Sequence, residues 1–94
     1  MPKVIPQHRL RRSERVIAQS TAGTTVLLSM DGGKYYSLDE VGSRVWELSD
    51  GSRTVAEIVA LLGGEYEIQL ETLERDVLEL LTDLANENLV ATVP

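Results

Sequence analysis

The sequence predicts an α+β domain in which a three-stranded antiparallel sheet precedes three helices. Two observations predict this order. Short runs rich in β-branched and aromatic residues, separated by glycine-containing turns, fill residues 14–38. From residue 39 onward, apolar residues recur at helical spacing between capping residues and glycines. A chain of 94 residues is long enough for one small domain.

Three strands joined by short turns are expected first. They cover residues 14–20, Thr24–Met30 and Lys34–Leu38. Residues 31–33, Asp-Gly-Gly, are a tight hairpin signal, because such turns need left-handed torsions that glycine adopts readily. The three strands therefore form an antiparallel meander.

Capping residues delimit the first two helices. Asp39 is expected to cap the first helix, which Ser49-Asp50-Gly51 ends. Thr54 and Glu57 have the spacing of a capping box at the start of the second helix. Gly63-Gly64 is expected to end that helix.

The third helix is the longest and covers residues 70–86. Leu78 lies on one flank of its apolar stripe, and Asp76 and Asp83 lie on the other. Residues 89–93 form a closing extended segment. The stripe itself comprises Leu73, Val77, Leu80, Leu81 and Leu84.

The simplest arrangement packs the helices on one face of the sheet, because no element buries its apolar side alone. Trp46 is expected to anchor the core between them, and Gly42 to permit close packing of the first helix. This set of elements is that of a winged helix-turn-helix domain, with the sheet placed before the helices. The expected domain covers residues 14–93.

Residues 1–13 are expected to form a disordered basic arm, since they contain two prolines and show no apolar period. Residues 1–15 carry five basic side chains and one acidic one, whereas the whole chain has a net charge of −6. The arm is either a solvated tail, or a segment that contacts a partner.

The composition excludes most catalytic chemistry. There is no cysteine and one histidine, His8, so thiol catalysis, a histidine-rich metal site and a Ser-His-Asp triad are not expected. The glycine pairs lack the Lys and Ser or Thr of a phosphate-binding loop. The sequence predicts no catalytic residue, no metal and no cofactor.

Membranes and nucleic acids are also poor candidates as partners. No apolar run or secretory signal is present, so a cytoplasmic protein is expected. The third helix carries six acidic residues, counting Glu87, against Arg75 alone, and would be repelled by phosphates.

An exposed edge strand offers another function, because its unpaired main-chain groups can bind an extended peptide. The strand Lys34–Leu38 is suitable, since it lacks proline. Alternation puts Lys34, Tyr36 and Leu38 on one face, and Tyr35 and Ser37 on the other. The two tyrosines are either half-buried packing residues of the sheet or anchors for a bound peptide.

Two blocks of the sequence resemble a known family. They are Gly33-Lys34-Tyr35-Tyr36-Ser37-Leu38-Asp39-Glu40-Val41-Gly42-Ser43-Arg44-Val45-Trp46-Glu47-Leu48 and Asp50-Gly51-Ser52-Arg53-Thr54-Val55-Ala56-Glu57-Ile58. Together with the later Asp76-Val77, they are similar to the pyrroloquinoline quinone biosynthesis protein D-like family of precursor-peptide recognition elements. Within it, the chain most resembles the free-standing proteins of lasso-peptide clusters. Asn86-Glu87-Asn88 stands where the family usually has a glycine.

The resemblance implies a non-catalytic function. Such proteins bind the leader segment of a ribosomally made precursor peptide and present it to a transglutaminase-like leader peptidase, followed by an ATP-dependent macrolactam synthetase. The alternative is a winged-helix regulatory or protein-interaction module without a role in peptide maturation. A monomer or a weak homodimer is expected.

The resemblance also implies a site. The leader would add as a strand beside Lys34–Leu38 and lie against the third helix, whose groove-facing flank the helical projection leaves open. Asp76 has an alternative structural role, as a salt bridge or cap within the fold, for instance with Arg53. The residues expected at the site are Lys34, Tyr35, Tyr36, Ser37 and Leu38, with Leu78 and Leu81 as the apolar floor and Asp76, Glu79 and Asp83 as contacts for basic leader residues.

Overall fold

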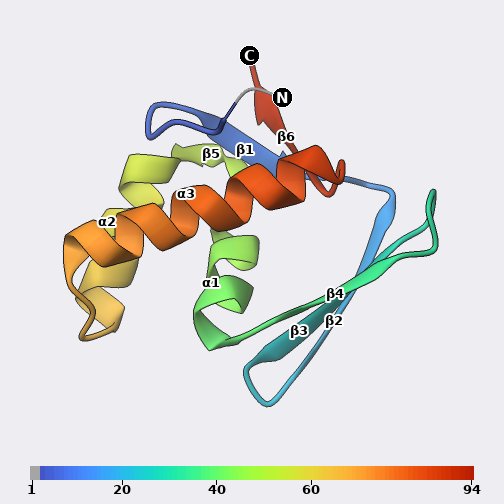
Figure 1. Ribbon diagram of the computed structural model, residues 1–94, viewed down its shortest axis with the longest axis horizontal. Coiled ribbons are helices and arrows are strands. Elements are labelled where there is room, and N and C mark those ends of the chain that lie inside the picture. The colour runs from blue at the N-terminus through green and yellow to red at the C-terminus, as the bar shows by residue number, and fades with distance from the viewer. Residues whose placement is uncertain (1–2) are drawn as a thin grey trace.

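Two small antiparallel sheets and three helices make up the computed structural model, which describes residues 3–94 (Figure 1). The order of elements confirms the predicted α+β class, with a meander of three strands before three helices. The winged-helix designation stays a prediction. The elements are β1 Arg9–Arg12, β2 Val16–Thr21, β3 Thr24–Ser29, β4 Tyr35–Leu38, α1 Glu40–Leu48, β5 Asp50–Thr54, α2 Val55–Glu65, α3 Leu70–Asn86 and β6 Val90–Val93.

The predicted meander is the sheet β2-β3-β4, in which β3 lies in the middle and β4 at one edge. Its register pairs Ile17 with Leu28 and Leu28 with Tyr35. The turn between β2 and β3 contains Gly23, whose φ of 83° suits a residue without a side chain. Strand β4 then leads directly into α1.

The predicted caps are present. Asp39 accepts a 2.8 Å hydrogen bond from the main-chain nitrogen of Gly42 at the start of α1. Thr54 and Glu57 form the reciprocal capping box of α2, with distances of 2.8 and 3.1 Å.

The predicted end of α2 at Gly63-Gly64 is wrong, because the helix continues to Glu65. A Cβ atom on Gly63 would lie 2.7 Å from Cδ2 of Leu70. Gly63 therefore permits the first residue of α3 to pack closely on α2, and it does not terminate the helix. The third helix has the predicted bounds.

A second sheet, with the order β5-β1-β6, corrects the expectation of a disordered arm for the described residues before Glu14, whereas residues 1 and 2 of that arm lie outside the described residues. Strand β1 pairs on one side with β5 and on the other with β6. Leu10 is only 1% exposed, and Val4 is also buried. Residues 49–51 were expected only to end α1, yet β5 starts at Asp50. The N-terminal segment is thus part of the domain.

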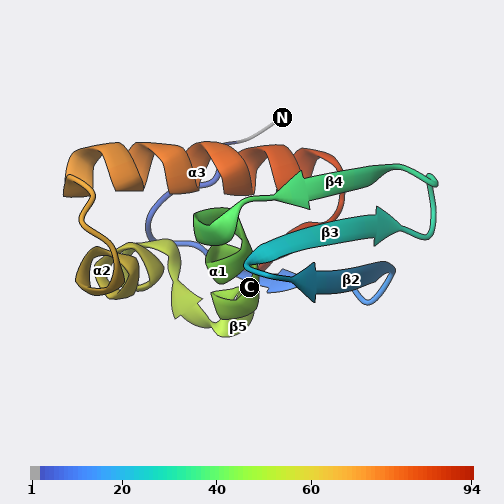
Figure 2. The same ribbon diagram turned by 90° about the horizontal axis from the view of Figure 1, so that it is seen from below.

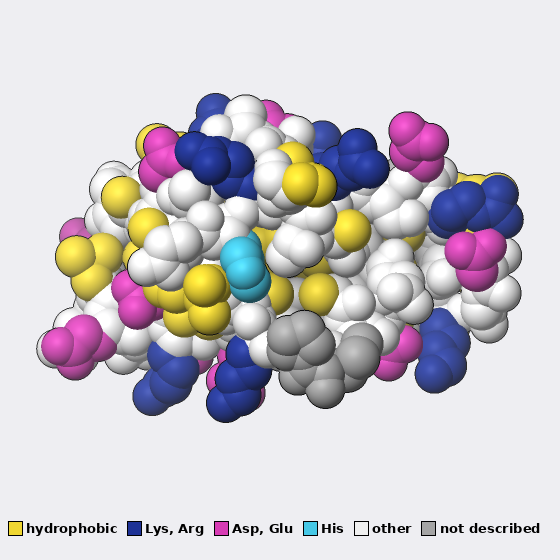
Figure 3. Space-filling model, turned by 90° about the horizontal axis from the view of Figure 1, so that it is seen from above, with side chains coloured by type: hydrophobic (Ala, Val, Ile, Leu, Met, Phe, Trp, Pro, Cys, Tyr) yellow, Lys and Arg dark blue, Asp and Glu magenta, His cyan; other side chains and the backbone are white. Residues whose placement is uncertain are grey.

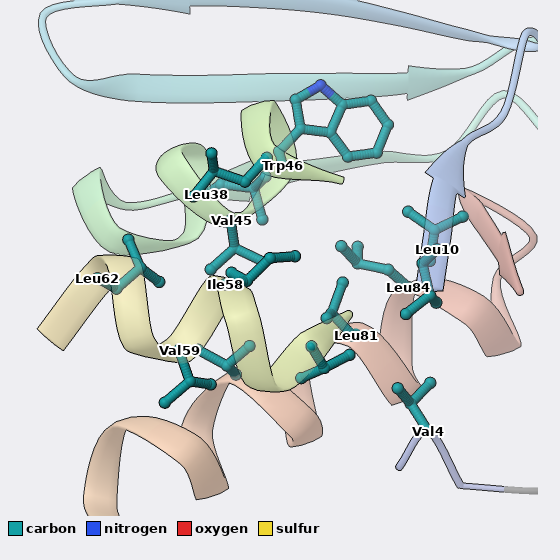
Figure 4. Close-up of a cluster of buried hydrophobic side chains, with 14 of the residues drawn as sticks. Val4, Leu10, Leu38, Val45, Trp46, Ile58, Val59, Leu62, Leu81 and Leu84 are labelled. Atoms are coloured by element: carbon teal, nitrogen blue, oxygen red, sulfur yellow. The ribbon is translucent and has the colours of Figure 1, made fainter. Parts of the chain in front are cut away.

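The core lies where the three helices meet the two sheets (Figure 4). Trp46 is 6% exposed, in agreement with its predicted role as a core anchor. Gly42 also has the predicted function, since an added Cβ would lie 3.3 Å from Cβ of Leu38 and 3.5 Å from Cδ2 of Leu80. This contact brings α1, β4 and α3 close together.

The face formed by the second sheet and the N-terminal segment carries several Lys and Arg side chains (Figure 3). Arg9 and Arg11 are exposed on β1, on either side of the buried Leu10. No helix within residues 3–94 combines the length and apolar character needed to cross a membrane.

Candidate functional site

The free edge of β4 faces α3. Figure 2 shows β4 between β3 and α3, with its partner strand on one side only. An open groove of about 640 Å³, here called the β4–α3 groove, lies between the end of β4, the start of α1 and the middle of α3. Its lining includes Ser37 and Leu38 of β4, which were both predicted at the site.

The floor of the groove is apolar. Leu80 is half-buried and lies beside the close contact of Gly42 with Leu38. Because Gly42 has no side chain, the groove is deeper at this point. The apolar lining residues are Leu38, Val41, Val45, Ile68, Leu73, Val77 and Leu80.

Three carboxylates of α3 form an acidic rim along the groove: Asp76, Glu79 and Asp83. Their positions in the helix resolve the open question of its orientation, since the flank with Asp76 and Asp83 faces the groove. The example of a structural salt bridge between Asp76 and Arg53 is wrong, since Asp76 pairs instead with its neighbour Arg75. Asp76 Oδ1 lies 3.5 Å from Nε of Arg75, whereas Arg53 Nη1 lies 3.3 Å from Oδ2 of Asp50.

A second hollow continues along the other end of β4, near the end of α3. Lys34, Tyr36 and Glu87 are among its lining residues. Burial raises the pKa of the Tyr36 phenol above its ordinary value of 10.0, and the neighbouring carboxylates of Glu87 and Asp83 raise it further. Tyr36 therefore remains a neutral hydrogen-bonding group in this second hollow at physiological pH.

Five of the predicted site residues lie outside the β4–α3 groove: Lys34 and Tyr36 line the second hollow, and Tyr35, Leu78 and Leu81 line neither. Leu81 is 0% exposed and belongs to the core, so the prediction that it forms the groove floor is wrong. Leu78 is half-buried on the opposite flank of α3 and does not line the groove. Tyr35 is 72% exposed and points away from the core-facing side that Tyr36 and Leu38 occupy. Tyr36 is thus a packing residue of the sheet, and Tyr35 is not.

Leu80 lines the groove, although the sequence prediction placed it only in the apolar stripe of α3 and not at the site. The helical projection could have indicated it, because Leu80 lies at the edge of that stripe, next to the flank of Asp76 and Asp83. Val41 and Ile68 were missed as well, since they come from α1 and from the segment before α3. Their approach to the groove depends on tertiary packing.

The groove combines an unpaired strand edge, an apolar floor and an acidic rim. An extended peptide fits this arrangement, because its main chain can pair with β4 while alternate side chains enter the groove. Within residues 3–94, no group of three or more His, Asp or Glu side chains is placed to hold a metal ion.

Comparison with solved structures finds similar chains, three of which share more than 25% of their sequence with this one. TbiB1 in complex with the TbiA(beta) leader peptide has 34% identity and a TM-score of 0.79, covering 89% of this chain and 98% of that one. Lasso peptide synthetase B1 complexed with the leader peptide has 26% identity and a TM-score of 0.74, covering 92% and 99%.

The third similar structure is the PqqD truncation of Methylobacterium extorquens PqqCD, described as a stand-alone recognition element for ribosomally synthesised and post-translationally modified peptides. It has 27% identity and a TM-score of 0.71, and 87% of each chain is covered. No curated protein sequence matches this chain.

The family model for coenzyme PQQ synthesis protein D matches residues 24–90, which include the meander from β3 onward and all three helices. This span is well over half of the chain. The protein therefore belongs to the coenzyme PQQ synthesis protein D (PqqD) family.

Proposed function

We propose that this protein binds the leader segment of a ribosomally synthesised precursor peptide, and that the leader adds as a strand to β4. One observation carries the proposal: the free edge of β4 opens onto an apolar groove under α3. Two structures similar over most of this chain are described as complexes with leader peptides. The product is proposed to be a lasso peptide.

In this binding mode, the main chain of residues 34–38 pairs with the leader. Side chains on one side of the bound strand enter the groove, where Leu38 and Leu80 contact apolar residues. The rim of Asp76, Glu79 and Asp83 lies beside the strand and favours a leader with Lys or Arg on that side.

The protein is proposed to act without catalysis, as a carrier that presents the leader to other enzymes. A transglutaminase-like leader peptidase and a macrolactam synthetase are the proposed partners, because binding alone cannot cleave or cyclise a peptide. The contribution of this chain is then to hold the leader extended and to raise its local concentration at the enzyme.

Calorimetry with a synthetic leader from the same gene cluster tests the proposal. Saturable binding at micromolar or tighter affinity is expected, and no binding of the cognate leader would contradict it. A proline scan of the leader tests the mode of binding. Proline at a paired position should weaken binding, because it removes a donor from the ladder. Unchanged affinity at every position would exclude strand addition.

A further inference from the structure

Two further hollows continue from the β4–α3 groove past the Lys34 end of β4. The groove and the second hollow are both bounded by β4 and α3, and one helical turn separates Asp83 of the groove from Glu87 of the hollow. A third hollow of about 370 Å³ shares Arg15 and Asn88 with the second. The groove and the two hollows therefore lie in line along one path.

The third hollow lies where the link between β1 and β2 passes the C-terminal end of α3 (Figure 1). The main-chain nitrogen of Ser13 in this link donates a 2.9 Å hydrogen bond to the main-chain oxygen of Leu89 in the turn after α3. The start of β6, with Val90 and Ala91, bounds the other side of the hollow. Main-chain pairing between β1 and β6 thus sets the position of its walls.

The charge of the lining side chains changes sign along the path. Four carboxylates line the β4–α3 groove, and no described basic residue does. The second hollow is lined by two basic and two acidic side chains. A peptide along the path therefore meets negative charge at one end and positive charge at the other. The third hollow is lined by three arginines and one glutamate: Arg11, Arg12, Arg15 and Glu14.

Most of the positive charge of the third hollow is not neutralised by the fold. Within residues 3–94, Arg11 forms no ion pair with a carboxylate. Arg12 donates to two main-chain oxygens at the end of α1, which carry no full negative charge. Arg15 is paired with Asp31 at 2.8 Å, but both side chains are more than 60% exposed, so this pair is weak. Acidic side chains of a ligand would therefore find cations to pair with.

We propose that the part of the precursor peptide which leaves the paired segment at the Lys34 end of β4 is acidic, and that Arg11, Arg12 and Arg15 hold it in the third hollow. Main-chain pairing alone permits a parallel or an antiparallel strand at the edge of β4. The charge along the path selects one direction, because a reversed leader would place its acidic flank against the acidic rim. The inference rests on the proposed function and adds the class of leader that this chain selects and the direction of the bound strand.

Three synthetic variants of the cognate leader test the inference. A proline scan first locates the segment that pairs with β4, and the four residues on each side of it are then replaced. One peptide carries Glu before the segment and Gln after it, the second carries them in the reverse order, and the reference carries Gln on both sides. The first two have the same composition and net charge, so a difference between them comes from position alone. Affinities are measured by calorimetry at low salt, where exposed charges are least screened.

Two double variants of the protein identify the cations responsible. Arg11→Gln/Arg15→Gln removes two of the three arginines of the third hollow and keeps the hydrogen bonds of Arg12. Lys3→Gln/Arg9→Gln is the matched control, since it removes the same charge from exposed residues of the N-terminal segment that line neither the groove nor these two hollows. Thermal unfolding checks that both variants remain folded.

With the wild type, one of the two Glu peptides should bind about fivefold more tightly than the reference, and the other more weakly, because its Glu residues lie beside the acidic rim. Arg11→Gln/Arg15→Gln should lose most of this gain, and Lys3→Gln/Arg9→Gln should keep it. Equal binding of the two Glu peptides to the wild type would overturn the inference, as would a gain that both variants keep or both lose. Failure of the unmodified leader to bind would instead contradict the proposed function.

Discussion

The guanidinium of Arg12 donates a 2.8 Å hydrogen bond to the main-chain oxygen of Trp46. The same nitrogen also donates to the main-chain oxygen of Glu47 at 2.7 Å. Both acceptors lie in the last turn of α1, where carbonyl groups lack the usual partner four residues on, and the Trp46 oxygen also accepts a 3.2 Å hydrogen bond from the main-chain nitrogen of Ser49. Strand β1 thus caps the C-terminal end of α1 from a distant part of the sequence.

Replacing Arg12 with Ala should lower the free energy of unfolding by about 1–2 kcal/mol, because two charge-assisted hydrogen bonds to carbonyl groups are lost. Chemical denaturation measures the change. Arg11→Ala is the matched control, since Arg11 is an exposed neighbour on the same strand, and its change should stay within about 0.5 kcal/mol. Equal effects of the two variants would contradict the role of Arg12 as a cap.

Deleting residues 1–13 should abolish cooperative folding, because the deletion removes the middle strand of the second sheet and the buried Leu10. Thermal unfolding followed by circular dichroism is the measurement. The milder variant Leu10→Ala should lose about 2–5 kcal/mol. A truncated protein that unfolds at the wild-type temperature would restore the idea of a disordered arm.

Leu80→Ala should weaken leader binding about tenfold, since it removes part of the apolar groove floor. Leu78→Ala is the control, because Leu78 is also half-buried on α3 but lies on the flank outside the groove. Calorimetry with the same leader compares them. If Leu78→Ala has the larger effect, the leader contacts the other flank of the helix.

The acidic rim should make leader binding sensitive to salt. We expect the affinity to fall as the salt concentration rises, and the double variant Glu79→Gln/Asp83→Asn to flatten this dependence. Glu71→Gln/Glu74→Gln removes the same charge from α3 outside the groove and should leave the dependence close to that of the wild type. Identical salt dependence in all three proteins would exclude a role for the rim.

Stability at acidic pH should depend on Glu57. Hydrogen bonding to the main chain of Thr54, and then to its side chain, lowers the pKa of Glu57 below its ordinary value of 4.5. Because this pKa is lower in the folded state, the ionised carboxylate of Glu57 contributes its full stabilisation at pH values above 4.5. This contribution is lost as the pH falls through the folded-state pKa. Glu57→Gln should therefore lose less stability on acidification than the wild type, as measured by urea unfolding from pH 7 to pH 3. Glu71→Gln, at an exposed position, should follow the wild type.

Local patterns predicted the local elements well. The meander, the cap at Asp39 and the bounds of α3 all depend on residues close in sequence. Asn88 has a φ of 60°, a conformation that Asn tolerates better than most residues and that suits the end of α3.

The second sheet could not be predicted in the same way. Strand β5 contains Gly51 and Ser52, which have poor strand propensity, and it pairs with a strand about forty residues earlier. Only the distant partner makes it a strand. The groove could be predicted only in part, for a similar reason. The helical projection of α3 gave two flanks that could face the groove, and only the packing of Leu81 into the core decides between them.

The same edge of β4 that can receive a leader is also open to a second copy of this protein, which would lead to uncontrolled self-assembly. The carboxylates of α3 beside the edge oppose that outcome. Two copies that joined edge to edge would bring two acidic helices together, whereas a leader with a basic side chain gains from the same charges. Asp76, Glu79 and Asp83 should therefore disfavour the edge-to-edge pairing of two copies and favour a basic peptide at the same edge.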